Sequence, residues 1–250
     1  IHFSSIREQL LEKKRIDHDL DVARSIQFSL LPKQIPEFPG IEIAAYNYPA
    51  LEVGGDYYDF IQVDEDHLGI AIADVSGKGI SGAIIMAMCR SVLRAQARGN
   101  RSPADVLRTV NQVMLSDISE DMFVCMLYMV LNIHTHEITV ARAGLERPIL
   151  YTNDAEQSVT PINTRGCALG LTDEDTFDMI LEEVTMTMQP GSVIVAYSDG
   201  ITEARDVNQE EWGFANLTET VRQTAPEDAY CVIGSVRERI MRFVGKMKQY

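Results

Sequence analysis

The sequence predicts an α+β fold built in layers, and three observations lead to this prediction. The chain has 250 residues, of which 46% are hydrophobic and 24% are charged, with only 9 Pro and 16 Gly; this composition is typical of a folded globular protein. Short runs with the composition of strands come first, followed by two helical stretches, further strands and two final helices. This order differs from a regular alternation of strands and helices, so we expect sheets and helices in separate layers.

The first element is a predicted helix over residues 4–31, which contain no Gly or Pro and are followed by Pro32. Its apolar seam is narrow and consists of Ile16, Leu20, Ala23 and Leu30. Such a seam favours a coiled coil with a second copy of the chain, and a helix packed along its own domain fits equally well. We expect residues 1–35 to form a linker and dimerisation helix and residues 36–250 to form the catalytic domain.

The remaining elements follow from local composition and periodicity. Predicted strands cover residues 41–48, 56–63, 68–73, 123–132, 137–141, 148–151, 179–185 and 192–197. Predicted helices cover residues 81–98, 103–118, 215–224 and 228–246.

Charge and composition also exclude several classes of function. A net charge of −15 repels a phosphate backbone, so we expect no nucleic-acid partner. The four cysteines are far apart and form no zinc-binding pattern, which favours free thiols in a reducing compartment. The longest apolar stretch, residues 123–131, is too short to span a bilayer, and the N-terminus lacks a signal-peptide pattern. We therefore expect a cytoplasmic protein with no membrane insertion of this segment.

Three aspartates stand where the strand pattern calls for apolar residues or a strand end. Asp74 ends the row formed by alternate residues of the strand before it, and Asp199 ends a similar row in "SVIVAYSDG". Asp56 follows Gly54 and Gly55, which allow close approach of the backbone to a ligand. An unpaired buried carboxylate is costly, and a divalent cation held by carboxylates and loop carbonyls would compensate it. The alternative for Asp199, which precedes Gly200, is an ordinary turn residue.

Two neighbouring features are given other roles. Asp59 points to the opposite face of its strand from Asp56, which predicts a supporting or capping role for it rather than metal binding. His134 and His136 are interpreted as residues at the edge of a hairpin, because alternating residues at the junction of a turn and a strand more often mark such an edge than a metal site.

At this point the chain resembles a known family. The motifs "VGGDYYDF", "IADVSGKGISGA" and "AYSDGITEARD", with the approach "ARSIQFSLLP", resemble the RsbU and SpoIIE type branch of the metal-dependent protein phosphatase 2C superfamily, over roughly residues 20 to 245. The resemblance implies an αββα sandwich in which two Mn²⁺ or Mg²⁺ ions activate water to attack a phosphoserine or phosphothreonine. It assigns Asp56, Asp74, the carbonyl of Val75 and Asp199 to the metals, with Asp74 bridging them.

The resemblance also implies partners. They are a phosphorylated regulatory protein, such as an anti-sigma-factor antagonist of the STAS type, and a sensor domain upstream of the linker helix. In that branch the helices after Gly79 lie beside the metal site and move between inactive and active arrangements, and core packing is the alternative role of their apolar stripe.

The sequence departs from the family pattern at three places. Family members usually finish with a strand that begins Asp-Asp and supplies one more metal ligand, and residues 1–250 end at "VGKMKQY" without it. The strand either follows these residues or is missing from the protein, in which case metal binding is weakened. Leu145 replaces a common His, and "RGCALGL" replaces a more usual Gly-x-Pro-Leu-Gly, which predicts altered loop packing or substrate contacts. The missing ligand leaves open a second function, that of a phosphatase-like module that binds a phosphoprotein without hydrolysing it. "GGDYYDF" is also similar to the GGDEF signature of diguanylate cyclases, but Tyr57 replaces the second acidic residue and a second Asp-bearing strand follows.

Overall fold

The computed structural model describes residues 2–48, 54–77 and 79–245. The helices in this part of the chain are α1 (His2–Leu30), α2 (Ile80–Ala97), α3 (Pro103–Asp117), α4 (Glu174–Ile180), α5 (Asp199–Thr202), α6 (Gly213–Thr224) and α7 (Ala229–Val244). The strands are β1 (Tyr57–Gln62), β2 (His67–Val75), β3 (Val124–Asn132), β4 (Glu137–Ala143), β5 (Ile149–Tyr151), β6 (Val159–Pro161), β7 (Glu183–Thr187) and β8 (Val193–Val195).

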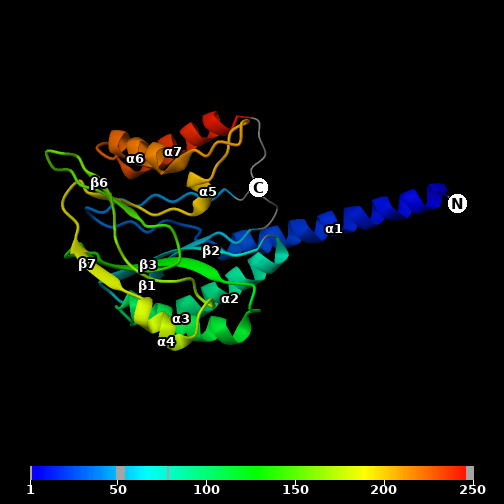
Figure 1. Ribbon diagram of the computed structural model, residues 1–250, viewed down its shortest axis with the longest axis horizontal. Helices are drawn as coiled ribbons and strands as arrows, with labels where there is room; N and C mark the ends of the chain where they lie inside the picture. The colour runs from blue at the N-terminus through cyan, green and yellow to red at the C-terminus, as the bar shows by residue number, and fades with distance from the viewer. Residues whose placement is uncertain (1, 49–53, 78, 246–250) are drawn as a thin grey trace.

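These elements form four layers. A five-stranded antiparallel sheet in the order β1-β2-β3-β4-β7 lies next to a three-stranded sheet in the order β6-β5-β8. Helices α2, α3 and α4 cover the outer face of the larger sheet, and α6 and α7 cover the smaller one (Figure 1). The predicted α+β class and the αββα sandwich are therefore confirmed.

Three apolar clusters hold the layers together, one between each pair of neighbours. The largest lies between the five-stranded sheet and α2 and α3, and includes Tyr57, Leu93 and Tyr128. The cluster between the two sheets includes Leu127 and Val140, and a third, which contains Tyr151 and Trp212, fastens α6 and α7 to the smaller sheet. Burial of this apolar surface is the main stabilising contribution to the sandwich.

Helix α1 leaves this sandwich as a long arm, and its N-terminal end lies far from the sheets (Figure 1). Near its other end, Leu30 and the following Leu31 pack against the largest apolar cluster. The predicted helix over residues 4–31 is confirmed, and its last turn rests on the domain.

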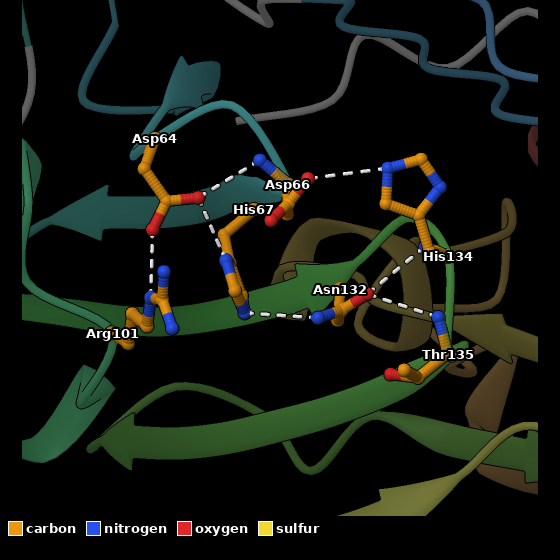
Figure 2. Close-up of polar contacts among 7 residues, drawn as sticks. All are labelled: Asp64, Asp66, His67, Arg101, Asn132, His134 and Thr135. Atoms are coloured by element: carbon orange, nitrogen blue, oxygen red, sulfur yellow. Dashed lines mark hydrogen bonds and ion pairs between the residues drawn. The ribbon is translucent and has the colours of Figure 1, made fainter.

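One end of the five-stranded sheet carries a polar cluster that joins two hairpins (Figure 2). In the β1–β2 turn, Asp64 accepts hydrogen bonds from Arg101 Nε and from His67 Nδ1, each at 2.7 Å. On the β3–β4 side, Asn132 Oδ1 accepts from the backbone N–H groups of His134 and Thr135. The opposite end of β2 carries Asp74, so the chemistry discussed below lies at the other end of the sheet.

Two predicted strands differ in the structure. Residues 41–48 form no regular strand, and only Ile41 makes an isolated bridge, to Phe38, because no neighbouring strand among the described residues pairs with this segment. The strand predicted for residues 179–185 begins too early, since α4 continues to Ile180 and β7 starts at Glu183. Asp173 caps α4 by accepting a hydrogen bond from the Thr176 N–H at 3.0 Å, and this local bond explains a short helix that the apolar pattern did not indicate.

Candidate metal centre

Strand β2 places Asp74 on the face of the large sheet that looks toward the smaller sheet. Ile70 and Ile72 on the same face pack in the cluster between the sheets, while Ala71 and Ala73 face the helices. The predicted alternation along this strand is confirmed. Asp74 pairs in register with Cys125 of β3, one residue before β2 ends.

Asp56 lies directly before β1 and is held close to the end of β2. Gly55 makes this approach possible, because a Cβ atom at position 55 would lie 2.6 Å from the carbonyl oxygen of Val75. Only glycine fits that contact without a backbone shift. Gly55 therefore makes a close approach, with the Val75 backbone as the group approached, while the predicted approach to a ligand stays a prediction.

The sequence argument for Asp199 is wrong in its geometry. Strand β8 ends at Val195, and Val193 and Val195 pack against the α6 and α7 cluster rather than between the sheets. Asp199 is the first residue of the short helix α5, after the N-cap residue Ser198. A turn of the chain, and not the alternation of a strand, therefore brings Asp199 to the site.

The three aspartates are close enough to influence one another. The pKa of Asp74 is raised to about 7, mainly by burial and then by the negative charges of Asp56 and Asp199, in that order of size. Burial also raises the pKa of Asp56, a hydrogen bond from Ser198 partly offsets this, and the charge of Asp199 adds to the rise. Carboxylates with raised pKa values are groups whose negative charge is not balanced by a neighbouring cation.

Cys125, on the neighbouring strand β3, is affected by the same negative charges. Its pKa is raised to about 11, mainly by burial and then by the negative charges of Asp74 and Asp199. Sequence reasoning missed Cys125 as a neighbour of the site, because the pairing of β2 with β3 cannot be deduced from the composition of either strand alone.

In the part of the chain that the structure describes, no group of three or more His, Cys, Asp and Glu side chains is placed to hold one metal ion. The three aspartates nevertheless interact electrostatically in every pairing: Asp74 with Asp56, Asp74 with Asp199, and Asp56 with Asp199. The arrangement fits two ions that share the three carboxylates. Each ion would then take two carboxylates and complete its shell with carbonyl groups and water, which hard divalent cations accept readily.

Helix α1 also reaches this region, and sequence reasoning missed its contact. The Gln27 side chain donates a hydrogen bond to the Gly54 carbonyl and accepts one from the Gly54 N–H at 3.2 Å. A small cavity beside Asp56 is lined by Gln27, Phe28, Asn47 and their neighbours. Gln27 follows Ala23 by four residues and precedes Leu30 by three, so it continues the spacing of the predicted apolar seam, and its polar side chain at that position was the available signal.

Other predicted features take structural roles. Asp59 lies on the opposite face from Asp56, as expected, and is bound by Arg94 of α2. His134 and His136 lie in the turn between β3 and β4, which confirms their interpretation as hairpin residues. Leu145 is buried between the sheets, so its replacement of a polar residue changes loop packing.

Comparison with known proteins identifies the family. Residues 64–248 match the model of the stage II sporulation protein E (SpoIIE) family. The chain belongs to the SpoIIE family. This match covers more than half of the chain and includes Asp74, Val75 and Asp199.

Two curated relatives share significant sequence similarity with this SpoIIE-family chain. It is 33% identical over 199 residues to phosphoserine phosphatase RsbU of Bacillus subtilis, and 28% identical over 231 residues to protein IcfG of Synechocystis. These alignments cover 78% and 81% of the chain but only 57% and 35% of the two relatives. The chain thus spans little more than half of RsbU and about a third of IcfG.

Solved structures of other proteins have the same fold as this SpoIIE-family chain. The PP2C domain of SiaA from Pseudomonas aeruginosa superposes with a TM-score of 0.78 at 20% identity, over 95% of this chain and 94% of that one. The RsbU and RsbW domains of a Mycobacterium tuberculosis protein give a TM-score of 0.65 at 23% identity, over 77% of this chain and 52% of that one. These likenesses show a fold shared with PP2C phosphatase domains.

Proposed function

We propose that the chain is a metal-dependent protein serine/threonine phosphatase, with residues 36–250 as its catalytic domain. The observation that carries the proposal is the cluster of Asp56, Asp74 and Asp199, in which burial first, and then the negative charges of Asp56 and Asp199, raise the pKa of Asp74 to about 7. The family match and the name of RsbU as a phosphoserine phosphatase support the same activity.

The proposed ligands divide into two sets that share Asp74. Asp56, Asp74 and the carbonyl of Val75 would hold one Mn²⁺ or Mg²⁺ ion, and Asp74 and Asp199 would contribute to a second. A structural neighbour, RsbX, was crystallised in complex with magnesium, which supports a divalent cation in this fold. A strand with a further aspartate would complete the second set, as the resemblance implies.

The chemistry needs little from the protein beyond placement of charge. Bound Mn²⁺ or Mg²⁺ would supply Lewis-acid activation of a water molecule and neutralise negative charge on the phosphoryl group. The chain's own contribution is to hold three carboxylates within electrostatic reach of one another and to keep the Val75 backbone against Gly55. This arrangement favours a doubly charged cation over a lysine or arginine, because one site must balance several negative charges.

The proposed substrate is a phosphorylated regulatory protein, with a STAS-type anti-sigma-factor antagonist as the specific candidate. Among the structural neighbours, one protein combines RsbU and RsbW domains and another belongs to the bacterial stressosome, so this fold occurs in regulatory assemblies. These neighbours support a protein substrate over a small phosphate ester.

We propose further that residues 1–35 form a linker that joins two copies and receives a signal from an upstream sensor. The support is the exposed surface of α1, on which Leu11, Ile16, Val22 and Ile26 are each about half exposed in a single copy. Among the described residues, no helix has the length and apolar character needed to cross a membrane.

The test is hydrolysis of a phosphoserine protein and of p-nitrophenyl phosphate with Mn²⁺, with Mg²⁺ and with a chelator. We expect activity that depends on the metal and that falls by about 10²-fold or more in Asp74→Asn, because a ligand shared by both ions is lost. Asp175→Asn, an exposed position on α4, is the matched control and should retain activity.

Two outcomes would contradict the proposal. Near-native turnover by a folded Asp74→Asn variant would remove the metal assignment. Binding of a phosphorylated protein without hydrolysis, with either metal, would favour the alternative of a non-catalytic module.

A further inference from the structure

Asp59 is a buried carboxylate that the proposed chemistry does not use. It is 1% exposed and lies on the face of β1 that packs against α2. Arg94 Nη1 donates to both of its oxygens, at 2.9 and 2.7 Å, and the Tyr57 hydroxyl donates at 2.6 Å. The carboxylate is thereby fully paired although it is out of contact with water.

A buried ion pair of this kind is a poor source of net stability. The cost of removing both charges from water offsets most of their attraction, and an apolar pair of similar volume often stabilises a protein as well. What the pair does supply is a fixed distance and orientation between two elements, because a carboxylate bound on both oxygens tolerates little displacement. The elements fixed here are β1, which Asp56 immediately precedes, and α2.

The other end of α2 lies against the backbone of the candidate metal centre. Gly82, in its first turn, has no room for a side chain, since a Cβ atom would lie 3.0 Å from the Gly77 carbonyl oxygen and 3.7 Å from the Gly55 Cα. Gly55 in turn packs directly on Val75. A shift of α2 along its axis would therefore be transmitted through Gly55 to Val75 and Asp56.

We propose that Asp59 and Arg94 are positioning residues that fix α2 against β1 and thereby hold Asp56 and the Val75 carbonyl in place for a divalent cation. The inference rests on the proposed function, since it concerns the same metal centre. Arg94 acts from a distance, because Gly82 and Arg94 are twelve residues apart on one helix, about 18 Å along its axis.

Arg90 lies on the same helix as Arg94 and serves as a control position for it. Its Nε donates to the Leu30 carbonyl at 2.8 Å and lies 3.9 Å from Asp59, beyond hydrogen-bond distance. Arg90 therefore ties α2 to the end of α1 and makes only the longer of the two ion pairs with Asp59. Arg101, which pairs with Asp64 at the far end of the sheet, is a second control of the same residue type.

The experiment measures Mn²⁺ binding to the whole chain directly, by electron paramagnetic resonance of the free ion, alongside thermal stability and the Mn²⁺ dependence of hydrolysis. We expect Arg94→Gln to weaken Mn²⁺ binding by about 10- to 100-fold, the range found for residues that orient metal ligands. Turnover at saturating Mn²⁺ should stay near the wild-type value, Arg94→Lys should recover part of the affinity, and Arg90→Gln and Arg101→Gln should bind as the wild type does.

A structural role alone would lower the melting temperature of Arg94→Gln and leave its Mn²⁺ affinity unchanged, and that result would overturn the inference. If Arg94→Gln fails to fold, the double variant Asp59→Asn with Arg94→Met is measured in its place. This double variant leaves no unpaired buried charge. Wild-type Mn²⁺ affinity in the folded double variant would also overturn the inference. Absence of Mn²⁺ binding by the wild type would refute the proposed function, and the positioning role with it.

Discussion

Asp59 and Asp74 are carboxylates on neighbouring strands, yet they have opposite surroundings. Asp59 receives hydrogen bonds from Arg94, Tyr57 and the Phe60 N–H. Asp74 faces two further negative charges, from Asp56 and Asp199. At the scale of single residues, this contrast separates a carboxylate that fixes structure from one that is available to a cation.

The sequence predicted Asp74 well because one local rule, the alternation of side chains along a strand, determines its face. It predicted the position of Asp199 for the wrong reason, since a turn after β8 carries that residue. It did not reveal Arg94 as the partner of Asp59, because the two are 35 residues apart and meet only when α2 packs on β1.

The polar cluster around Asp64, at the end of the five-stranded sheet away from Asp74, gives a prediction for the pH dependence of stability (Figure 2). Burial opposes ionisation of Asp64, but hydrogen bonds from His67, Arg101 and the Asp66 N–H outweigh it and hold the pKa of Asp64 well below its usual value of 3.8. A lowered pKa in the folded state stabilises the protein above the unfolded pKa, and this stabilisation is lost as the pH falls through the folded pKa. Wild type should therefore be more stable than Asp64→Asn at pH 7, and the difference should shrink once the pH falls below about 4.

Urea unfolding of both proteins between pH 2 and pH 7 measures this difference. Asp66→Asn is the matched control, because Asp66 lies in the same turn and contacts the more exposed His134 at 3.2 Å. A difference between wild type and Asp64→Asn that stays constant down to pH 2 would show that the hydrogen bonds to Asp64 do not shift its ionisation.

The same cluster orients the hydrogen bonds of the His67 ring. Asn132 Oδ1 accepts two backbone N–H groups, so its Nδ2 is the atom that faces His67 Nε2 at 3.2 Å. His67 Nε2 must then accept, and its proton lies on Nδ1, which donates to Asp64. The β1–β2 and β3–β4 hairpins are thus joined by a directed chain of hydrogen bonds.

At the scale of elements, prediction succeeded where one periodicity runs through a whole segment. Helices α2, α3, α6 and α7 lie within a few residues of their predicted bounds. It failed for α4, which a cap and the single fully buried side chain of Phe177 define, and for residues 41–48, whose strand character depends on a partner. Short elements of this kind are set by tertiary contacts that leave little local pattern.

Helix α1 gives a prediction about the oligomeric state of the chain. Its last turn is anchored by Leu30 and Leu31, while Ile16 remains exposed along the arm. We expect the chain to be a dimer at tens of micromolar, paired through the seam of α1. An isolated helix is only marginally stable in water, and pairing would bury the apolar residues of its seam. Leu20→Glu should convert it to a monomer, and Lys14→Glu, outside the predicted seam, should leave the dimer intact.

Light scattering on these two variants, and on a chain without residues 1–30, tests the pairing. A monomeric wild type, or a Leu20→Glu variant that remains dimeric, would contradict the assignment of this seam. Regulation by an upstream sensor would be tested separately, in a protein that carries the sensor.

At the scale of the whole molecule, the four layers place unbalanced negative charge at one end of the sandwich within a chain of net charge −15. Metal binding should then stabilise the entire fold, because both sheets contribute to the site through β2 and the turn after β8. At a metal concentration of 100 times the dissociation constant, the gain is about 2.7 kcal/mol. For a protein of this size that corresponds to a rise of roughly 5 to 10 °C in the melting temperature.

We therefore expect Mn²⁺ to raise the melting temperature of the wild type and of Asp175→Asn equally, and to have little effect on Asp74→Asn. The comparison removes general screening of the acidic surface, since both variants lose one negative charge and only Asp74 is a proposed metal ligand. Differential scanning calorimetry with a Mn²⁺ titration gives the measurement, and a matched concentration of NaCl shows the contribution of ionic strength alone. An equal shift in Asp74→Asn would mean that the cation stabilises the molecule from elsewhere on its surface.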